Sequence, residues 1–473
     1  GIGMTIASQI HQTSYETDHC DIGIVHIGFG AFHRAHQAVF IDDYMQTSGD
    51  LRWGIAAVNL RGSESSVFAQ HNANGYLLKT VTPQGESTLR RVRSHRAFYD
   101  WALDAGGAEA LFARDSVHMV TITVTESGYY TDPAGNLKGD DAAIVAELSA
   151  GGTAASRTTI YAYLAAGLNA RKQAGGAALT ICCCDNVRHN GAMLKRNLLK
   201  YLELLGDASL VDWVTEQVRF PSSMVDRITP RATQELADSL SAETGEPVTH
   251  PVLAEAFTQW VLEDNFAGPM PDLAHVGVTI TADVNPYEET KIRVLNGGHT
   301  CLSYLAALHN IETFDQAMRT PELFDHFWGY ETQEVLPALT LELPFSKQAY
   351  LDDIAARFKS EAIADTVARI CADGFAKFPI FIRPTLEGCL SQGIMPQFGI
   401  TSIASWHCFC QHVAAGRVPF DYNEPSWTEL AVLIGTDDFV TSKQLWGDLP
   451  TTYPAFADAM RAEIKRMELK WPV

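Results

Sequence analysis

The segment YEETKIRVLNGGHTCL, residues 287–302, holds three side chains whose types suit acid–base chemistry. A lysine in a desolvated site has a lowered pKa and can act as a base. An asparagine amide can donate to an oxyanion, and a histidine can orient a hydroxyl group. Lys291, Asn296 and His299 supply these three groups within nine residues. Together they are suited to chemistry at a hydroxyl group.

On a straight α-helix these side chains share one broad arc. At about 100° per residue, Asn296 lies about 140° and His299 about 80° from Lys291. Glu288 lies about 60° from the lysine on the same side. The two glycines between Asn296 and His299 fall mainly outside the arc, where they would let another backbone pack closely. A solvated polar face that ends at a glycine break explains the spacing equally well, so both interpretations stay open.

A second candidate site is a glycine turn between a predicted strand and a predicted helix, in VHIGFGAFHRAH. Gly28 permits a tight turn, and Gly30 lets the backbone approach a pyrophosphate at the helix N-terminus. His33 stands where the usual fingerprint has its third glycine. With Arg34 and His36 it forms a basic cluster suited to phosphate. The alternatives are a plain strand–helix turn and, for the basic cluster, a solvated helix start.

Polar residues also follow other predicted strands. Asn59 and Arg61 come at the end of the second strand, where an NAD-specific site commonly carries an acid. An arginine there either accepts a 2′-phosphate or is a plain surface residue. Thr125 and Glu126 follow the third strand, and Asn186 follows the fourth. Ligands collect at the carboxyl ends of strands in a doubly wound sheet, so these residues are candidates for binding.

Two further segments carry charged residues among apolar ones. Asp226 and Arg227 lie in FPSSMVDRITPR, where the spacing favours a function and a structural salt bridge in a loop equally. Arg369 and Lys377 lie in RICADGFAKFP, where a pair of surface charges is the simpler interpretation.

Three consecutive cysteines, residues 182–184, do not predict a metal site. Adjacent strand residues point to opposite faces, so three in a row cannot converge on one ion. Small apolar fillers explain them better. The chain has nine cysteines, an odd number at irregular spacings. This indicates reduced thiols in a cytoplasm rather than a disulfide framework.

The elements that position these residues change type along the chain. Predicted strands in DIGIVHIGFG, RWGIAAVNL, SVHMVTITVTESG and AALTICCCDN alternate with helices, and another strand is predicted near residues 276–284. This alternation predicts an α/β fold with a doubly wound parallel sheet. From about residue 287 only helical segments follow. We therefore expect one domain over residues 1–285 and an all-α domain over residues 286–473.

The composition and charge of the chain disfavour three classes: nucleic-acid-binding, membrane-spanning and secreted proteins. The formal net charge is −21, with 56 acidic and 35 basic residues, which disfavours binding to nucleic acid. No apolar run approaches the roughly 20 residues of a membrane span, and the N-terminus shows no secretory signal. We expect a cytoplasmic protein.

The chain resembles the mannitol dehydrogenase family of long-chain polyol dehydrogenases in segments that run in family order: VHIGFGAFHRAHQA, TVTESGYY, CDNVRHNG, MVDRITP, WVLEDNF, KIRVLNGGHTCL and ADGFAKFP. The resemblance implies an NAD-dependent, metal-independent enzyme. Residues 1–285 would form an extended Rossmann-type domain that binds the dinucleotide, and residues 286–473 an all-α domain that binds substrate. The active site would lie between the two domains, in a monomer rather than an oligomer.

The resemblance also implies roles for the candidate residues. Lys291 would be the general base, with Glu288 as a gate or proton relay behind it. Asn186 and Asn296 would form an oxyanion hole, and His299 would hold the substrate or the base in place. The residues implied to contact the polyol or the nicotinamide end are Asp226, Arg369 and Lys377. Those implied to bind the cofactor are Gly28, Phe29, Gly30, Phe32, His33, Arg34, Asn59, Arg61, Thr125 and Glu126.

The reaction implied is the oxidation of a polyol to a ketose. The segments CCDNVRHNG, VDRITPR, PYEETKIRVLN, PTLEGCLSQG and LWGDL favour the D-arabinitol 4-dehydrogenase subgroup, and hence D-arabinitol to D-xylulose. Mannitol 2-dehydrogenase and a hexuronate reductase, acting on fructuronate or tagaturonate, are alternatives within the family. A non-catalytic NAD-binding sensor is the alternative outside catalysis. The residues leave the choice of NAD or NADP open.

Overall fold

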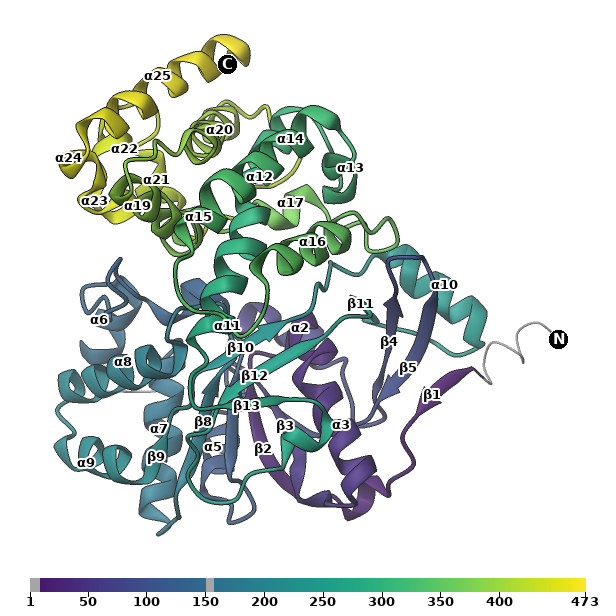
Figure 1. The fold of residues 1–473 in the computed structure, drawn as a ribbon. Helices are drawn as coiled ribbons and strands as arrows, with labels where there is room; N and C mark the ends of the chain where they lie inside the picture. The colour runs from purple at the N-terminus through teal and green to yellow at the C-terminus, as the bar shows by residue number, and fades with distance from the viewer. Residues whose placement is uncertain (1–8, 150–156) are drawn as a thin grey trace. The chain divides into compact units, whose positions relative to one another are not determined.

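The computed structural model describes residues 9–149 and 157–473 (Figure 1). The chain forms two compact units. The first unit comprises Gly1–Thr82 and Glu86–Val284, and the second comprises Pro83–Gly85 and Asn285–Val473.

A six-stranded parallel sheet forms the centre of the first unit, with the strands in the order β6-β3-β2-β7-β8-β9. Their bounds are β2 (Ile22–Ile27), β3 (Gly54–Asn59), β6 (His95–Asp100), β7 (Met119–Ile122), β8 (Leu179–Cys183) and β9 (Val218–Arg219). The order runs outward from β2 in both directions, as in a Rossmann sheet, so the topological switch point lies between β2 and β7. The doubly wound sheet and its four predicted strands, now β2, β3, β7 and β8, are confirmed.

Helices cover both faces of this sheet (Figure 1). Residues of α7 (Ile160–Gln173), α8 (Asn190–Leu205) and α9 (Ala208–Gln217) pack with Cys183 in one core cluster. Residues of α3 (Gln37–Ser48) pack with Cys182 and Cys184 in the other. The consecutive cysteines therefore point to opposite faces, as predicted from the alternation of a strand. All nine cysteines are free thiols.

Two smaller sheets complete the first unit. One has the order β1-β5-β4-β11, with β1 (Ile10–Gln12), β4 (Tyr76–Val81), β5 (Ser87–Val92) and β11 (Val252–Glu255). The other has the order β10-β12-β13, with β10 (Ser223–Asp226), β12 (Gln259–Glu263) and β13 (Thr279–Thr281). The strand predicted near residues 276–284 is present as β13. It pairs with β12 in this small sheet and is not part of the doubly wound sheet.

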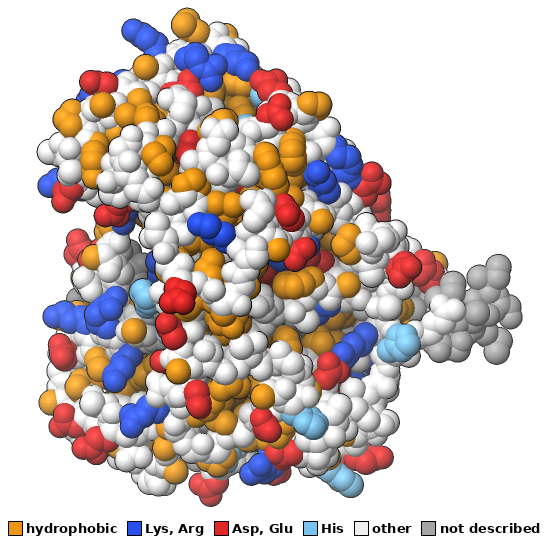
Figure 2. Space-filling view, viewed as in Figure 1, with side chains coloured by type: hydrophobic (Ala, Val, Ile, Leu, Met, Phe, Trp, Pro, Cys, Tyr) orange, Lys and Arg blue, Asp and Glu red, His pale blue; other side chains and the backbone are white. Residues whose placement is uncertain are grey.

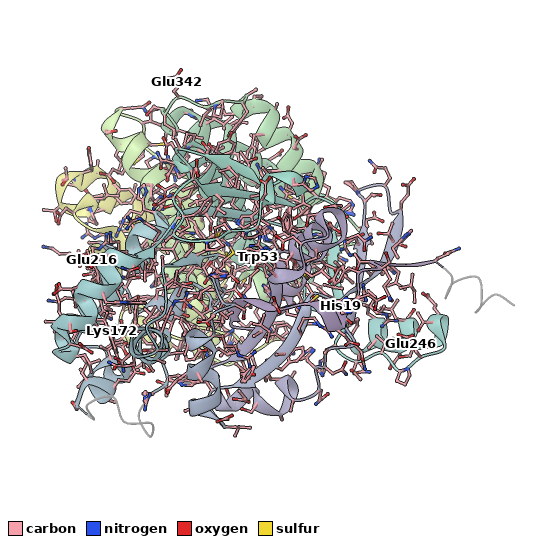
Figure 3. All side chains as sticks on the ribbon, turned by 90° about the horizontal axis from the view of Figure 1, so that it is seen from below. His19, Trp53, Lys172, Glu216, Glu246 and Glu342 are labelled. Carbon is pink, nitrogen blue, oxygen red and sulfur yellow. The ribbon has the colours of Figure 1, made fainter. Side chains whose placement is uncertain are left out.

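The helix predicted after the glycine turn is interrupted. It forms α2 (Ala31–Ala35) and α3, which are separated at His36 by a non-helical backbone conformation. The remaining helices of the first unit are α4 (Ser65–Phe68), α5 (Ala105–Ala110), α6 (Ala142–Ser149) and α10 (Gln234–Thr244). The short helix η2 (Leu51–Trp53) places the indole of Trp53 in the core, where its Nε1 donates to Asp50 at 3.0 Å (Figure 3).

The second unit contains helices and no strand over residues 285–473, as predicted. Three of its helical rods contain a π-helical turn: α11 (Asn285–Lys291), η8 (Ile292–Asn296) and α12 (Gly297–Leu308); α14 (Pro321–Tyr330), η9 (Glu331–Val335) and α15 (Leu336–Ala338); and α18 (Gly374–Lys377), η10 (Phe378–Ile382) and α19 (Arg383–Ser391). The turn η8 packs against both η9 and η10. The other helices are α13 (Phe314–Met318), α16 (Lys347–Phe358), α17 (Val367–Ile370), α20 (Gln397–Ala414), α21 (Trp427–Ala431), α22 (Asp438–Thr441), α23 (Lys443–Trp446), α24 (Leu449–Thr452) and α25 (Pro454–Lys470).

Charged side chains are spread over the surface. Acidic and basic groups are interspersed on the face shown in Figure 2. Among the described residues, no helix is long and apolar enough to cross a membrane.

Candidate active site

A cavity of about 610 Å³ opens in the first unit at the carboxyl ends of β2, β3 and β7. This is the position where open α/β sheets bind ligands, beside the switch point of the strand order. Of the ten predicted cofactor residues, seven line it: Gly28, Phe29, Gly30, Arg34, Asn59, Arg61 and Thr125.

The two glycines of the turn have different surroundings. Gly28 has φ +90°, and a Cβ there would lie 2.0 Å from the carbonyl oxygen of Thr123. Only glycine therefore fits this position. Gly30 has no atom within 4 Å of its Cβ position, although it lines the cavity. The open space beside its backbone is what a pyrophosphate would need.

Of the three basic residues predicted to contact phosphate after the turn, the two histidines do not line the cavity. His33 is completely buried, stacks on His26 at 3.3 Å between ring centroids, and is hydrogen-bonded to His95 at 2.8 Å. Burial lowers the pKa of His33 to about 3, so the ring is neutral. His36 is also buried, and its Nε2 donates to the carbonyl oxygen of Gln259 at 2.8 Å. Both histidines are thus core residues, which corrects the interpretation of the cluster as a phosphate contact or a solvated helix start.

Arg34 is the member of the cluster that reaches the cavity. Its Nη1 donates to the carbonyl oxygen of His250 at 2.8 Å, and its guanidinium lies 5.6 Å from the ring centroid of Phe29. Its Nε is buried and has no hydrogen-bond partner among the described residues. A buried cation with a spare donor at a cavity wall suits an anion such as a phosphate.

The end of β3 carries no carboxylate. The Asn59 amide donates to the carbonyl oxygen of Arg61 at 2.9 Å and so holds the turn that follows the strand. The Arg61 side chain is exposed and lines the cavity, as do Glu64 and Arg231.

The turn after β7 is held by a buried acid from the next strand end. Asp185 accepts hydrogen bonds from the backbone N–H groups of Val124 at 2.9 Å and Thr125 at 3.1 Å, and from the Tyr129 hydroxyl at 2.5 Å. Thr125 has φ +66° and ψ 165°, a strained conformation for a residue with a side chain. Burial, and then the charge of Glu126, raise the pKa of Asp185 to about 7. The carboxyl of Asp185, which directly precedes Asn186 in the chain, therefore fixes the turn at Val124 and Thr125.

Besides His33, two predicted cofactor residues lie outside the cavity lining. Phe32 stacks on His36, with ring centroids 5.0 Å apart. Glu126 begins the 3-10 helix η5 (Glu126–Tyr129), where its charge acts on Asp185. Asp226, predicted to contact substrate, is buried at the end of β10.

In the second unit, the polar side chains of the segment 287–302 lie on one continuous helical rod. Glu288 and Lys291 are both buried, with 3% of each residue exposed, and Lys291 ends α11. The π turn η8 follows, and Asn296 is its last residue. π turns in α-helices are frequent at functional sites. The glycines that follow do not break the helix, which corrects the alternative of a polar face ending at a glycine.

The close packing predicted for these glycines is confirmed. A Cβ at Gly297 would lie 3.2 Å from the carbonyl oxygen of Phe381, in the turn η10. A Cβ at Gly298 would lie 2.9 Å from Cε2 of Phe327 and 3.2 Å from Oε2 of Glu331. The rod of Lys291 can approach its neighbours closely because both side chains are missing.

His299 follows Asn296 on the same rod, in α12. Burial lowers its pKa well below the usual value, and the positive charges of Arg369, Lys377, Arg357 and Lys291 lower it further. Three of these four cations were predicted as site residues. Their charges act on a neutral imidazole that can donate through one nitrogen and accept through the other.

Two of the cations are themselves anchored. The Arg369 Nε donates to Oδ1 of Asp365 at 2.7 Å, and its Nη2 pairs with the second carboxylate oxygen. The Lys377 Nζ donates to the carbonyl oxygen of Ile370 at 3.3 Å. Asp365 therefore offsets part of the positive charge near His299.

Two family models match the chain. The mannitol dehydrogenase Rossmann domain matches residues 22–275, and the mannitol dehydrogenase C-terminal domain matches residues 283–467. The chain belongs to the mannitol dehydrogenase family.

Individual relatives are similar over nearly the whole chain. The D-arabinitol 4-dehydrogenase of Ralstonia nicotianae is 36% identical over 455 residues, which cover 94% of this chain and 96% of the relative. The mannitol 2-dehydrogenase of Cereibacter sphaeroides is 37% identical over 428 residues, covering 89% and 87%. The solved ternary complex of Pseudomonas fluorescens mannitol 2-dehydrogenase with NAD and D-mannitol has a TM-score of 0.91 at 30% identity, covering 97% and 94%.

Membership confirms the resemblance seen in the motifs. The chain is an oxidoreductase of the polyol dehydrogenase type, with a Rossmann-type sheet followed by a helical region, as the family has. Among residues 9–149 and 157–473, no group of three or more His, Cys, Asp or Glu side chains could hold a metal ion.

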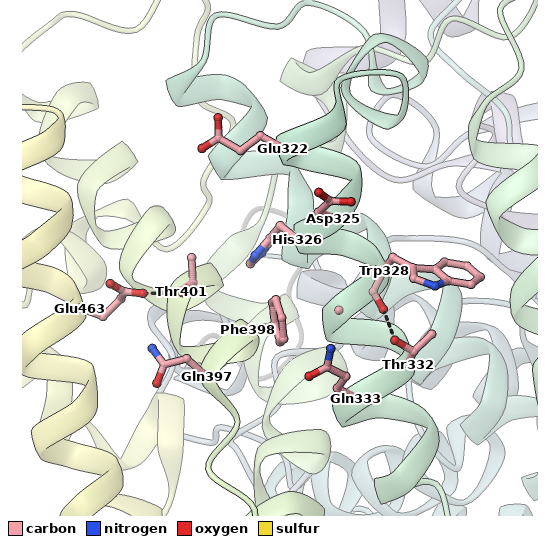
Figure 4. Close-up of a pocket in the computed structure, with 11 residues that line it drawn as sticks. Glu322, Asp325, His326, Trp328, Thr332, Gln333, Gln397, Phe398, Thr401 and Glu463 are labelled. Atoms are coloured by element: carbon pink, nitrogen blue, oxygen red, sulfur yellow. Dashed lines mark hydrogen bonds between the residues drawn. The ribbon is translucent and has the colours of Figure 1, made fainter.

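A second cavity of the mannitol dehydrogenase C-terminal region, about 560 Å³, contains none of the predicted site residues (Figure 4). It is bordered by α14, α20 and α25 and carries the acids Glu322, Asp325 and Glu463. Its histidine, His326, is neutral, because burial lowers its pKa to about 4. We do not assign the reaction to this cavity.

Sequence reasoning missed several residues that shape these sites. Arg357 and Phe358, at the end of α16, both act on His299, the first by charge and the second by ring stacking. Tyr129 and Asp185 hold the turn at Thr125. Asp185 carried a signal, since it follows a predicted strand, but no spacing in the sequence connects Phe358 with His299.

Proposed function

We propose that this polyol dehydrogenase oxidises D-arabinitol to D-xylulose with NAD as the hydride acceptor. The observation that carries the proposal is the buried Lys291 on one helical rod with Asn296 and His299. The charges of Lys291, Arg369 and Lys377 help to keep the His299 ring neutral. The substrate is proposed from the similarity to D-arabinitol 4-dehydrogenase. Mannitol 2-dehydrogenase activity is the second candidate, favoured by the relative and the solved structure that carry that name.

Lys291 is proposed as the general base. It is buried, and a buried lysine is the type of residue that serves as a general base. The amine would take the proton of the substrate hydroxyl, and a bound NAD would supply the acceptor for the hydride of the carbinol carbon. Glu288, buried one turn before Lys291, is proposed as the relay that passes the proton on.

The negative charge that develops on the substrate oxygen must be stabilised by hydrogen-bond donors. The amides of Asn296 and Asn186 are proposed for this role, and preorganised donors of this kind are each worth roughly 3–4 kcal/mol of transition-state stabilisation. His299 is proposed to orient the substrate hydroxyls. Asp226, Arg369 and Lys377 are proposed to contact the rest of the polyol or the nicotinamide end.

The cavity of the first unit fits a dinucleotide. Gly28 and Gly30 form a turn with open space beside it, and the spare buried Nε of Arg34 suits a phosphate oxygen. Phe29 and Thr125 line the same cavity. Asn59 and Arg61 stand where an NAD-specific site commonly carries an acid, so NADP is the alternative cofactor.

Steady-state oxidation of a panel of pentitols and hexitols with NAD and with NADP tests the proposal. We expect the highest kcat/KM for D-arabinitol with NAD, with D-xylulose as the product. A preference for D-mannitol would establish the second candidate. Reduction of fructuronate or tagaturonate in preference to any ketose would identify a hexuronate reductase. Nucleotide binding without turnover of any of these compounds would contradict catalysis and favour the NAD-binding sensor.

A further inference from the structure

The imidazole of His299 is held by aromatic rings on two sides. The Phe358 ring lies parallel to it, with centroids 4.2 Å apart and an angle of 12° between the planes. The Phe314 ring meets it nearly edge-on, at 4.8 Å and 79°. Phe358 and Phe314 also contact each other edge-to-face at 5.1 Å. The three rings come from α12, α16 and α13.

The space for this arrangement is created by Gly298. A Cβ at that position would lie 2.9 Å from Phe327 and 3.4 Å from Phe358. Phe327 in turn contacts Phe358, with ring centroids 5.8 Å apart. A side chain at Gly298 would therefore push the aromatic layer away from the helix that carries His299.

We propose that Phe358 is a positioning residue that fixes the plane of the His299 imidazole, and that Gly298 is required because it lets Phe358 reach the ring. The proposal rests on the proposed function, since His299 is there assigned to the substrate hydroxyls.

Stacking on Phe358 can orient the His299 imidazole because of the geometry of the ring. The two nitrogens of an imidazole lie in the ring plane, so fixing the plane fixes the directions in which they donate and accept. Rotation of the ring about its bond to Cβ would break the stack on Phe358 and drive the ring against Phe314. Stacked and edge-to-face aromatic pairs are favourable beyond their buried area. A substrate hydroxyl then meets a preoriented partner, and no ordering of the ring is needed during the reaction.

The positive charges near the ring favour the neutral imidazole. Lys291 on α11, Arg357 on α16, Arg369 on α17 and Lys377 on α18 all oppose a positive charge on His299. Two acids lie near this group: Asp365 pairs with Arg369, and Oε2 of Glu331 lies 3.2 Å from the Cβ position of Gly298. The ring is therefore held neutral by burial and by the neighbouring charges, and held in orientation by Phe358, and the two effects can be separated by mutation.

The experiment compares Phe358→Leu with Phe358→Tyr and with a matched control, Phe409→Leu. Leucine keeps much of the apolar volume and removes the ring, whereas tyrosine keeps the ring. Phe409 is as deeply buried as Phe358 and belongs to α20, where it packs on Tyr304, Phe420 and Tyr422. Each variant is measured for polyol kcat and KM, for NADH binding, and for the ¹⁵N signals of His299 in the protein without substrate.

For Phe358→Leu we expect a loss of kcat/KM of about 10- to 100-fold, the range expected when a reacting group is misplaced by about 1 Å. NADH binding should be unchanged, and the ¹⁵N signals of His299 should move toward the average of two interconverting tautomers. Phe358→Tyr and Phe409→Leu should stay within about threefold of wild type, because neither removes the stacked ring.

The proposal is overturned if Phe358→Leu matches Phe409→Leu in kcat/KM and leaves the His299 signals unchanged. If Phe358→Leu does not fold, Gly298→Ala serves in its place, because it should displace the ring and move the same signals. The ¹⁵N measurement needs no turnover. Moved signals in a protein that oxidises no polyol would support the ring contact and overturn only the proposed function.

Discussion

Alanine substitutions at Gly28 and Gly30 should have opposite effects on folding and cofactor binding. Both glycines belong to the turn after β2, yet only Gly28 is confined by its surroundings. An alanine at φ +90° is in the left-handed region, which costs about 1–2 kcal/mol. Its Cβ would also lie 2.0 Å from the Thr123 carbonyl oxygen. Overpacking against fixed backbone costs typically about 1–3 kcal/mol more.

Gly28→Ala should therefore lower the free energy of unfolding of the first unit by about 2–5 kcal/mol. Urea unfolding followed by tryptophan fluorescence measures this change, since Trp53 and Trp260 are fully buried in that unit. The cost is a large part of the 5–15 kcal/mol that stabilises a typical domain.

Gly30→Ala is the matched control for folding and the decisive test for binding. Its φ is −94°, and no atom lies within 4 Å of the new methyl group, so unfolding should be unchanged. The methyl group would instead occupy the open space where the pyrophosphate is proposed to bind. We expect NADH affinity, measured by calorimetry, to fall at least about tenfold, or 1.4 kcal/mol. Wild-type NADH affinity in a folded Gly30→Ala protein would refute the assignment of this cavity to the cofactor.

Three further predictions concern the base, the cofactor and the pH dependence of stability. Lys291→Ala should lower kcat for polyol oxidation by several orders of magnitude and leave NADH binding nearly intact; a loss below about tenfold would remove Lys291 as the base. Arg61→Ala should weaken the binding of NADPH more than that of NADH, as fluorescence titration of both nucleotides would show, and equal effects would mean that Arg61 contacts no 2′-phosphate. Because burial holds the pKa of His33 at about 3, below its ordinary value of 6.5, protonation favours the unfolded chain as the pH falls below 6.5. Urea unfolding at pH 7.5 and pH 5 should show this loss of stability, and His33→Gln should reduce it; an equal loss in the variant would assign it to other groups.

The sequence predicted four of the six strands of the central sheet because these four are mostly apolar. The segments of β2, β3, β7 and β8 are buried on both faces, so their residue types alone mark them as parallel strands. The hairpin of β4 and β5 escaped the same reasoning. Ser87–Val92 carries two arginines and is mostly accessible, which no buried strand would be. Its pairing depends on β4, and local composition does not show it.

The basic cluster after the glycine turn shows why residue type alone misplaces a side chain. His33 follows the turn at the position where a phosphate contact is expected, but it points into the core. The ring of His26, on β2, offers a parallel face there, and Gln37 and His95 satisfy both nitrogens. These partners lie up to 62 residues away in the chain, so no local pattern reveals them. Arg34 is longer and charged, and it stays at the cavity wall.

The π turn η8 explains why the spacing of the proposed catalytic residues fits two interpretations. Its closing hydrogen bond runs from the N–H of Gly297 to the carbonyl oxygen of Ile292, five residues earlier. Such a turn acts as one residue inserted into an α-helix, which sets every later side chain back by about 100°. On a straight helix Asn296 and His299 lie about 140° and 80° from Lys291, whereas the inserted residue brings them to about 40° and 20°. The spacing Lys-x4-Asn-x2-His therefore spreads the three side chains widely around a straight α-helix. In a helix with a π turn, which the chain forms here, the same spacing places them on one face.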